Sequence, residues 1–544
     1  MLNKLVVFTY LVFSSINLYS QHELKIELKD AETNEPISFA TIRFKGTSRG
    51  LVADYDGQFR LPYTIAENVE QIIVTSIGYE STEINLNTLD RNKINIITIR
   101  PQIENLDTEI LNLHKKERVK DDNGKIDRLE YIIKAGKKML ANGIVERAIK
   151  QIPNNLDNKN HSYIGYYRDY QFVNNKYYNL NEGILEQFDG GIQTFKRNDS
   201  TNKEVFYSFK QNADFETSET YALQYDGLNK FIKNAQILGF GGNELSILNV
   251  HNPIRNYNTN TFSYVYQLNR DFLNNHTFKK SDIYLVDGEP VITINFSTLK
   301  ELKKTYFSQS VTNQPKKIPR NKVEGNLTIA LTDFSIYRFN YTMHDFNDSN
   351  PLFNVNIEYR KENGKMYLNY ISFNNRFEVA EDFTFSTSDI IFNKKDYTFE
   401  VTVNSDLDYK TVKKRNFRIK FNGQRVMIKS VNTTDRRNIK IKVNDYDGSL
   451  AQLSQKDMQL LNFLIRDMKD SYGRGIYKTR TITAYQFREY FVQEVFKGKA
   501  ITTDLKYMSK IKPLNEAQIN YNLGNSTSYI INSPLQKRRI KSVN

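Results

Sequence analysis

Residues 46–59 of this chain, Gly-Thr-Ser-Arg-Gly-Leu-Val-Ala-Asp-Tyr-Asp-Gly-Gln-Phe, are the most informative stretch for its fold. Asp54-Tyr-Asp-Gly57 predicts a tight hairpin turn, because Asp and Gly tolerate the backbone conformations that reverse a chain. Short alternating runs lie on both sides of it and have the length and composition of strands. They are LKIELKD (24–30), ISFATIRFKG (37–46), GQFRLPY (57–63), EQIIVTSIGY (70–79) and INIITIR (94–100). Residues 21–101 are therefore predicted to form one small β-sandwich.

This stretch resembles the carboxypeptidase-D regulatory-like domain, a transthyretin-like β-sandwich common in Gram-negative envelope proteins. Ala53 departs from the family, which usually has Thr there. In the family the module accompanies peptidases and outer-membrane transporters and is not itself catalytic, so the resemblance implies a docking or scaffold role. The matching positions are Pro36, Ala40, Gly46, Gly50, Asp54, Asp56, Gly57, Phe59, Gly78 and Tyr79.

Residues 1–20 have the pattern of a secretory signal peptide. Lys4 supplies a positive charge, Leu5–Phe13 (LVVFTYLVF) is apolar, and cleavage is expected before Gln21. The apolar run is shorter than the ~20 residues that span a bilayer, and no later segment is long and apolar enough. We therefore expect an exported protein of the periplasm or the periphery of the outer membrane, with no transmembrane segment after signal cleavage.

The composition restricts the chemistry. The 544 residues include no cysteine, which excludes disulfides, thiolate catalysis and cysteine zinc sites. The 35 Tyr and 34 Phe favour strands. Aromatic residues also line sugar sites, but such sites often use Trp, so its absence disfavours this interpretation. The formal net charge is +14, but nucleic acid is not an expected partner of an exported protein.

The remaining chain divides into three predicted regions. Residues 102–160 read as a charged linker with two helical stripes, over 126–140 and 144–152, the second ended by Pro153. Residues 161–450 are rich in alternating strands, with Asn363-Gly364 as a hairpin turn. Residues 451–544 are predicted to hold helices at 451–468 and 485–496 and a basic tail. The expected fold is mainly β with α: sandwich, helical connector, large antiparallel β-rich domain and C-terminal helices.

The region from Ile126 onward also resembles an uncharacterised region that follows this module in many envelope proteins. The phrases that carry this resemblance are AIKQIPNN, YIGYYRDY, VNIEYRKENGKMYLNYI, FREYFVQEVF and INSPLQK. It implies a shared architecture and no activity. The strand series around Asn326–Phe373 is loosely similar to the curved half-barrels that hold lipids in periplasmic carriers.

Three motifs have the spacing of a catalytic or metal-binding site, but their sequence context argues against that function. Gly46-Thr-Ser-Arg-Gly50 fits the G-x-S-x-G pattern, yet strands flank it on both sides where a nucleophile elbow requires a following helix. His114-Lys-Lys-Glu117, with His251 as a distant third ligand, has zinc-like spacing but lies among lysines. Asp54-Tyr-Asp-Gly57 and Asp445-Tyr-Asp-Gly448 lack the terminal Glu of a calcium loop. No catalytic residue, metal or cofactor is predicted.

The sequence feature that favours a binding function is a run of basic residues. Residues 410–442 contain twelve Lys and Arg against one Asp. If 417–421, 425–429 and 439–443 are strands, their apolar residues face a core and most cations face outward. This predicts a site for lipopolysaccharide, acidic polysaccharide or an acidic envelope protein, although such a face also serves solubility alone. The candidate residues are Arg418, Lys420, Arg425, Lys429, Lys440 and Lys442.

The expected function is therefore that of a non-catalytic envelope scaffold that binds a partner protein or an anionic or lipidic ligand. The alternative is a peptidase or glycan hydrolase that uses carboxylates from distant parts of the chain. An outer-membrane barrel is disfavoured because the chain ends Lys-Ser-Val-Asn544, without a terminal aromatic residue, and because its strands are highly charged.

Overall fold

The computed structural model describes most of the chain and divides it into two compact units. Unit 1 comprises residues 1–218, 230–376 and 485–544, and unit 2 comprises 219–229 and 377–484. The described residues are 23–45, 49–66, 68–76, 78–101, 128–196, 200–226, 243–259, 267–286, 289–299, 321–345, 350–445, 448, 450, 461–521 and 529–535. The predicted signal peptide and residues 102–127 of the predicted linker region lie outside them.

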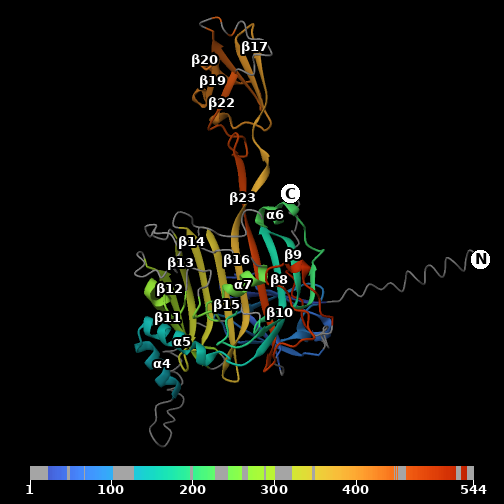
Figure 1. Ribbon diagram of the computed structural model, residues 1–544, viewed down its shortest axis with the longest axis vertical. Coiled ribbons are helices and arrows are strands. Elements are labelled where there is room, and N and C mark those ends of the chain that lie inside the picture. Colours follow the sequence, from blue (N-terminus) through green and yellow to red (C-terminus); the bar gives the residue numbers. More distant parts are fainter. Residues whose placement is uncertain are drawn as a thin grey trace, which may run out of the picture. The chain divides into compact units, whose positions relative to one another are not determined.

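The N-terminal module, drawn in blue in Figure 1, is a sandwich of two small sheets. One sheet has the order β4-β1-β7 and the other β3-β2-β5-β6. Alternate residues of the strands point inward to a closed apolar core that includes Ile26, Ile42, Phe59 and Val74. The strands are β1 (Leu24–Asp30), β2 (Thr41–Phe44), β3 (Gly50–Val52), β4 (Gln58–Leu61), β5 (Gln71–Thr75), β6 (Thr82–Asn85) and β7 (Ile94–Ile99).

The Asp54–Gly57 segment forms a tight turn, but not a hairpin. The amide of Gly57, at φ +70°, donates to the Asp54 carbonyl over 3.0 Å. The flanking strands β3 and β4 lie in different sheets, paired with β2 and β1. The turn therefore carries the chain from one layer of the sandwich to the other, which alternation alone does not reveal.

Two helices precede the large sheet, as predicted. They are α4 (Arg128–Lys138) and α5 (Ala141–Asn155). Pro153 lies inside α5 instead of ending it, in the last turn, where the missing N–H removes a single hydrogen bond. Ile144, Val145 and Ile149 of α5 are buried in the main core of unit 1.

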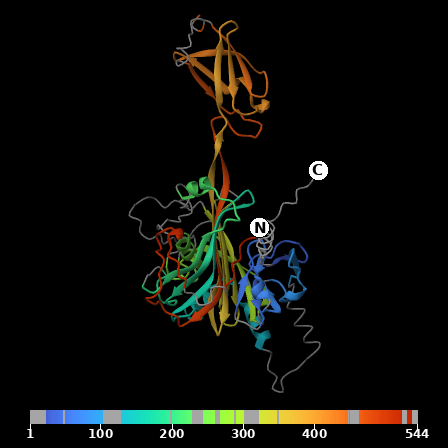
Figure 2. The same cartoon turned by 90° about the vertical axis from the view of Figure 1, so that its right-hand side faces the viewer.

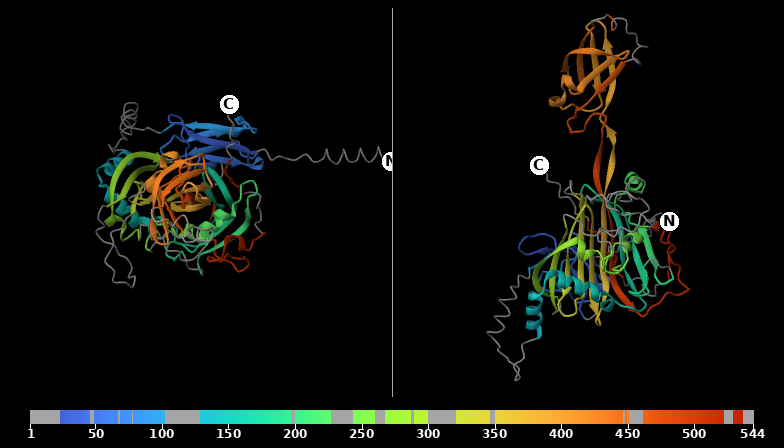
Figure 3. Two further views of the ribbon diagram at one scale, coloured as in Figure 1. Left: turned by 90° about the horizontal axis from the view of Figure 1, so that it is seen from above. Right: turned by 60° about the vertical axis from the view of Figure 1, so that its left-hand side comes forward.

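A ten-stranded sheet forms most of unit 1, in the order β10-β9-β8-β23-β16-β15-β14-β13-β12-β11. Figure 3 shows its curvature, with the N-terminal module on its outer side. Short helices α7 (Glu244–Val250) and α8 (Phe272–Asn275) also belong to unit 1. The strands are β8 (His161–Val173), β9 (Lys176–Asp189), β10 (Lys203–Gln211), β11 (His276–Val286), β12 (Glu289–Thr298), β13 (Asn321–Ala330), β14 (Ile336–Asp345), β15 (Pro351–Glu362), β16 (Lys365–Thr384) and β23 (Thr479–Lys497).

Both faces of the central strands are buried. On β8, Tyr163 and Tyr167 belong to the inner core shared with α5, α7 and α8. The alternate residues Ile164 and Tyr166 pack in a second cluster with Val52 of the module. Because both faces are covered, these strands read as nearly continuous apolar runs. The predicted Asn363-Gly364 turn is confirmed between β15 and β16, with both residues at positive φ.

Unit 2 is a six-stranded antiparallel β domain in the order β17-β18-β21-β20-β19-β22, with α6 (Glu219–Gln224) attached. Its own core includes Phe399, Val401, Phe417 and Ile441. The strands are β17 (Thr387–Asn393), β18 (Thr398–Val403), β19 (Phe417–Phe421), β20 (Gln424–Thr433), β21 (Asn438–Asn444) and β22 (Leu461–Ile465). The sequence placed 161–450 in one domain, and the structure instead separates 377–484 from the large sheet.

The predicted C-terminal helices are wrong where the structure describes them. Leu461–Ile465 is strand β22, which pairs with β19 along its whole length. The 485–496 segment lies within β23, a central strand with both faces buried. Among the described residues after 450, helical structure is limited to the single 3-10 turn Leu514–Glu516. The mainly β class is confirmed.

Candidate functional site

The predicted basic strands exist as β19, β20 and β21 of unit 2. Ile419, Val426 and Ile441 face the core of that unit, as alternation predicts. Arg418 and Lys420 on β19 and Arg425 on β20 are exposed on the opposite side. We call the outward cations Arg418, Lys420, Arg425, Lys429 and Lys442 the basic face.

Register brings two of these cations directly together. Lys420 of β19 lies opposite Arg425 of β20 in the antiparallel ladder. Side chains opposite each other on one face have Cβ atoms about 4.5–5.5 Å apart, and like charges at that spacing destabilise the pair. Arg418 lies two residues from Lys420 and therefore points to the same side. The three cations form one positive patch.

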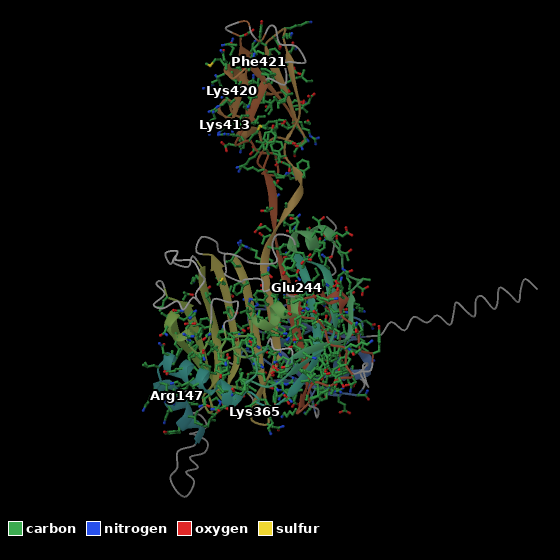
Figure 4. All side chains as sticks on the ribbon, in the orientation of Figure 1. Arg147, Glu244, Lys365, Lys413, Lys420 and Phe421 are labelled. Atoms are coloured by element: carbon green, nitrogen blue, oxygen red, sulfur yellow. The ribbon has the colours of Figure 1, made fainter. Side chains whose placement is uncertain are left out.

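The described carboxylates of unit 2 do not neutralise the basic face. Within the part of unit 2 that the structure describes, none of its five members forms a salt bridge. Lys413 is also exposed, and in Figure 4 it lies on the same side of the unit as Lys420. Residues 377–484 outside 410–442 contain eight Lys and Arg against thirteen Asp and Glu. The positive charge of unit 2 is thus concentrated in residues 410–442.

The sixth predicted residue, Lys440, is engaged differently. Its Nζ lies 3.5 Å from Asp396 and 3.5 Å from Glu400, and the side chain is partly covered. Arg436 and Arg437, in the β20–β21 turn, share Asp406 at 3.8 and 2.8 Å. Lys440 is therefore paired within the sheet and is not counted in the basic face.

Sequence reasoning missed a buried ionic cluster between the module and the large sheet. The Nε atom of Arg168 on β8 donates to Glu489 on β23 over 2.5 Å, and neither side chain has appreciable exposure. Tyr370 donates its hydroxyl to the same carboxylate over 2.8 Å. The Nη2 atom of Arg168 lies 3.9 Å from Asp54 of the module. We call these four residues the Arg168 cluster.

Asp54 is the member whose ionisation is disfavoured. Burial raises its pKa to about 7, and the attraction of Arg168 only partly opposes this effect. The charge of Arg168 is already balanced by the nearer Glu489. A signal for the cluster did exist in the sequence, because Arg168 stands on the same strand face as the apolar Ile164 and Tyr166. A charge at such a position requires a buried partner.

The last described residues fasten the module to the sheet. Asn532 accepts the backbone amide of Arg60 through its side chain over 2.9 Å, and its carbonyl accepts from Arg168 over 3.0 Å. The side chain of Arg60 donates to the carbonyl of Pro534 over 2.7 Å. Ile530 packs in the core of the module. We call residues 530–535 the C-terminal strap.

Two further ionic groups fix elements on the inner side of the sheet. Asp189 accepts two hydrogen bonds from Arg255, at 2.8 and 2.9 Å, and lies 3.1 Å from Lys196. Burial opposes the ionisation of Asp189, but these two cations hold its pKa well below the ordinary value. Arg488 donates to Glu244, which is labelled in Figure 4, and thereby ties α7 to β23. Burial raises the pKa of the adjacent Asp169 to about 7.

The remaining sequence candidates do not assemble into a site. Ser48, His114, Glu117 and Asp447 lie outside the described residues. His251 is fully buried, donates its Nδ1–H to the Ile247 carbonyl over 2.6 Å, and stacks on Phe373 with ring centroids 3.8 Å apart. Among the described residues no group of three His, Asp or Glu side chains has the arrangement to hold a metal ion.

Comparison with known proteins identifies the module. The module is a small β-sandwich whose two sheets are connected through the Asp54–Gly57 turn, and it packs on the larger sheet. Residues 27–110 match the family model of the CarboxypepD_reg-like domain, so the N-terminal module is a CarboxypepD_reg-like domain. The match covers this module and not the large sheet or unit 2. No curated protein matches the sequence.

Solved structures resemble the chain only distantly. A domain described as an outer membrane lipoprotein-sorting protein from Vibrio parahaemolyticus shares 9% identity at a TM-score of 0.20, covering 43% of this chain and 86% of its own. A LolA superfamily protein from Nitrosomonas europaea shares 11% identity at 0.18, covering 44% and 86%. A DUF1329 family protein from Desulfovibrio piger shares 9% at 0.19, covering 43% and 85%. Similarities this weak show neither the ligand nor the activity of this chain.

None of the helices within the described residues combines the length and the apolar character needed to cross a membrane.

Proposed function

We propose that this chain is a non-catalytic binding protein of the cell envelope, in which the basic face of unit 2 holds an anionic ligand or an acidic partner surface. The predicted export signal supports the compartment, and the CarboxypepD_reg-like module supports an accessory role. The observation that carries the binding proposal is the patch formed by Arg418, Lys420 and Arg425, which makes no salt bridge with any residue that the structure describes.

The physical argument is that repulsion within this patch is relieved by an external anion. Opposed cations on neighbouring strands destabilise the isolated domain, whereas a phosphate, sulfate or carboxylate group between them turns repulsion into attraction. Exposed charges act over roughly 10 Å at 0.1 M salt and less at higher salt. Binding is therefore expected to be strong at low ionic strength and to weaken steeply as salt is added.

The test compares charge reversals at two places in unit 2. R418E/K420E removes two members of the basic face, and K394E/K395E makes the same net change at the exposed turn between β17 and β18. Affinity for dextran sulfate and for lipopolysaccharide is measured at 50 and 500 mM salt. We expect the first variant to bind at least about tenfold more weakly at low salt, and the control to change by less than about twofold.

Equal losses in both variants would attribute binding to net charge and overturn the assignment to the basic face. Retention of full affinity by R418E/K420E would overturn it as well. Far-ultraviolet circular dichroism of both variants checks that the surface changes leave the sheet intact.

A further inference from the structure

A tight loop in unit 2 presents one aromatic ring to solvent. Between β22 and β23, the Asp470 amide donates to the Arg474 carbonyl over 3.0 Å, and the Gly473 amide donates to the Asp470 carbonyl over 2.9 Å. The ring of Tyr472 lies at the tip of this loop and is 71% exposed. An aromatic residue so exposed loses apolar contact unless a ligand restores it.

The ring is held in place from behind. The guanidinium carbon of Arg474 lies 4.9 Å from the ring centroid of Tyr472 and 4.1 Å from that of Phe383. Arg474 therefore sits between two aromatic rings, with only 15% of its own side chain exposed. Cation–π contacts of this type fix the orientation of the rings that make them.

The arginine is in turn fixed by a buried carboxylate. Its Nε atom donates to Asp470 over 2.7 Å, and its Nη2 atom donates to the Ser405 hydroxyl over 3.2 Å. Asp470 is buried and also accepts the backbone amides of Tyr472 and Arg474 over 3.1 and 2.8 Å. The loop and the ring are thus pre-organised, which reduces the entropy that binding has to offset.

Two exposed arginines, Arg436 and Arg437, lie at the same end of unit 2 as Tyr472. The amide of Ser471, the residue before Tyr472, donates to the carbonyl of Asp406 over 2.7 Å. The carboxylate of Asp406 is shared by Arg436 and Arg437, whose side chains are 82% and 58% exposed. Asp435, in the same turn, adds a second carboxylate, which accepts the backbone amides of Arg437 and Asn438. The charges of the turn are therefore balanced, but the exposed guanidinium groups of Arg436 and Arg437 remain within reach of an anionic group in solution.

From this juxtaposition of a rigid exposed ring and two exposed arginines we infer that Tyr472 is a stacking platform for a sugar unit of an acidic polysaccharide. The ring face attracts the C–H-bearing face of a pyranose, and Arg436 or Arg437 pairs with its carboxylate. The inference deepens the proposed function, on which it rests for the anionic character of the ligand. To the proposed function it adds the chemical class of the ligand, an acidic sugar, and a second area of contact besides the basic face.

The geometry favours a glycan over a membrane surface. Interfacial anchoring requires a broad apolar face that sinks into the headgroup region. Here a charged guanidinium lies directly behind the ring, and the ring itself carries a hydroxyl. A single fixed, flat ring matches one sugar face instead.

The experiment uses the absence of tryptophan from the chain. Y472W in the full-length protein introduces one fluorophore at the platform, and it is titrated with tetragalacturonate, dextran sulfate and phosphatidylglycerol vesicles in separate experiments. We expect a saturable emission change with tetragalacturonate. A change with the vesicles and none with the sugar would overturn the proposal in favour of a lipid surface.

Affinity measurements on alanine variants complete the test. Y472A is expected to bind tetragalacturonate at least about fivefold more weakly, and Y521A, which removes a tyrosine 85% exposed in unit 1, should bind it normally. Dextran sulfate binding should survive Y472A, because it depends on charge alone. Unchanged affinity of Y472A for the sugar would overturn the platform.

The two proposals fail separately. Loss of sugar binding in Y472A together with unchanged dextran sulfate binding in R418E/K420E would retain the platform and refute the basic face. The opposite result would retain the basic face and refute the platform.

Discussion

Arg168 has no exposed surface and lies between two carboxylates, Asp54 of the module and Glu489 of β23. Removing a buried cation while its partners remain leaves uncompensated charge in a poorly solvated place. We expect Arg168→Met to lower the free energy of unfolding by about 3–5 kcal/mol, measured by urea denaturation.

Lys150→Met is the control for this change, because Lys150 is exposed and pairs only with Glu146 one helical turn away. Its expected cost is below about 0.5 kcal/mol. A similar cost for both variants would refute the structural role assigned to Arg168.

Asp54 gives the module–sheet interface a pH dependence. Its pKa is raised from 3.8 to about 7 in the folded protein, so the folded state binds the proton more tightly than the unfolded state. The contribution of Asp54 to stability is complete below the unfolded pKa and is lost as pH rises toward 7. Each unit of pKa shift corresponds to about 1.4 kcal/mol.

Asp54→Asn keeps an oxygen that accepts the amides of Asp56 and Gln58 and removes the titration. We expect the wild-type protein to lose stability relative to this variant between pH 4.5 and 7.5, in unfolding curves taken in parallel. A constant difference between the two proteins across that range would contradict the raised pKa. Arg168, Glu489 and Asp56 are the charged groups that act on Asp54.

At the residue scale, the sequence predicted the outward cations but not their partners. Alternation places Arg418 and Lys420 outside because Phe417 and Ile419 must face a core. It does not reveal that Asp396 and Glu400 lie beside Lys440, because that pairing depends on the order β18-β21 in the sheet. The sequence does not predict the exposed ring of Tyr472, because its position depends on side-chain packing around a turn.

At the scale of elements, Gly165 on β8 is required by close backbone approach. A Cβ atom at this position would lie 2.1 Å from the Phe491 carbonyl oxygen on the neighbouring β23. We expect Gly165→Ala to destabilise the protein by more than about 2 kcal/mol, because the strands must move apart. Thermal unfolding monitored by circular dichroism measures this effect.

Gly143 supplies a matched substitution, since a Cβ atom there meets open space within helix α5. Gly143→Ala is expected to stabilise the protein by about 0.5–1 kcal/mol through helix propensity. If the two alanine variants had equal stability, the packing of β8 against β23 would be wrongly described.

The errors of sequence reasoning at this scale share one cause. In β23, Arg488, Tyr490 and Val492 face one side and Glu489 and Phe491 the other, and all are buried. Burial on both faces erases the period of two by which a strand is identified. Pairing with β16 and β8 outweighs the helical spacing of the apolar residues.

For the whole molecule, the separate cores of the two units predict separate unfolding transitions. Phe399 is fully buried in the core of unit 2, and Phe206 is fully buried in that of unit 1. We expect Phe399→Ala to lower one calorimetric transition and Phe206→Ala the other, each by about 3–5 kcal/mol. Parallel shifts of a single transition in both variants would show that the units unfold together.

The C-terminal strap predicts that the end of the chain controls how firmly the module is held. A chain ending at Tyr529 loses the bonds of Asn532 and Pro534 to Arg60, whereas one ending at Leu535 keeps them. Hydrogen exchange in β1 and β4 should be faster in the shorter protein and normal in the longer one. Equal exchange would mean that the strap is dispensable for the module.

Unit 2 enters the chain between β16 and β23, two strands that are neighbours in the large sheet (Figure 2). A short turn in place of residues 385–478 would close them as an ordinary hairpin, so the large sheet does not depend on that unit for its connectivity. Other domains can therefore be inserted between β16 and β23 without changing the order of strands in the large sheet. If unit 2 binds the ligand, as proposed, a different domain grafted there would change the ligand preference while the large sheet stays the same.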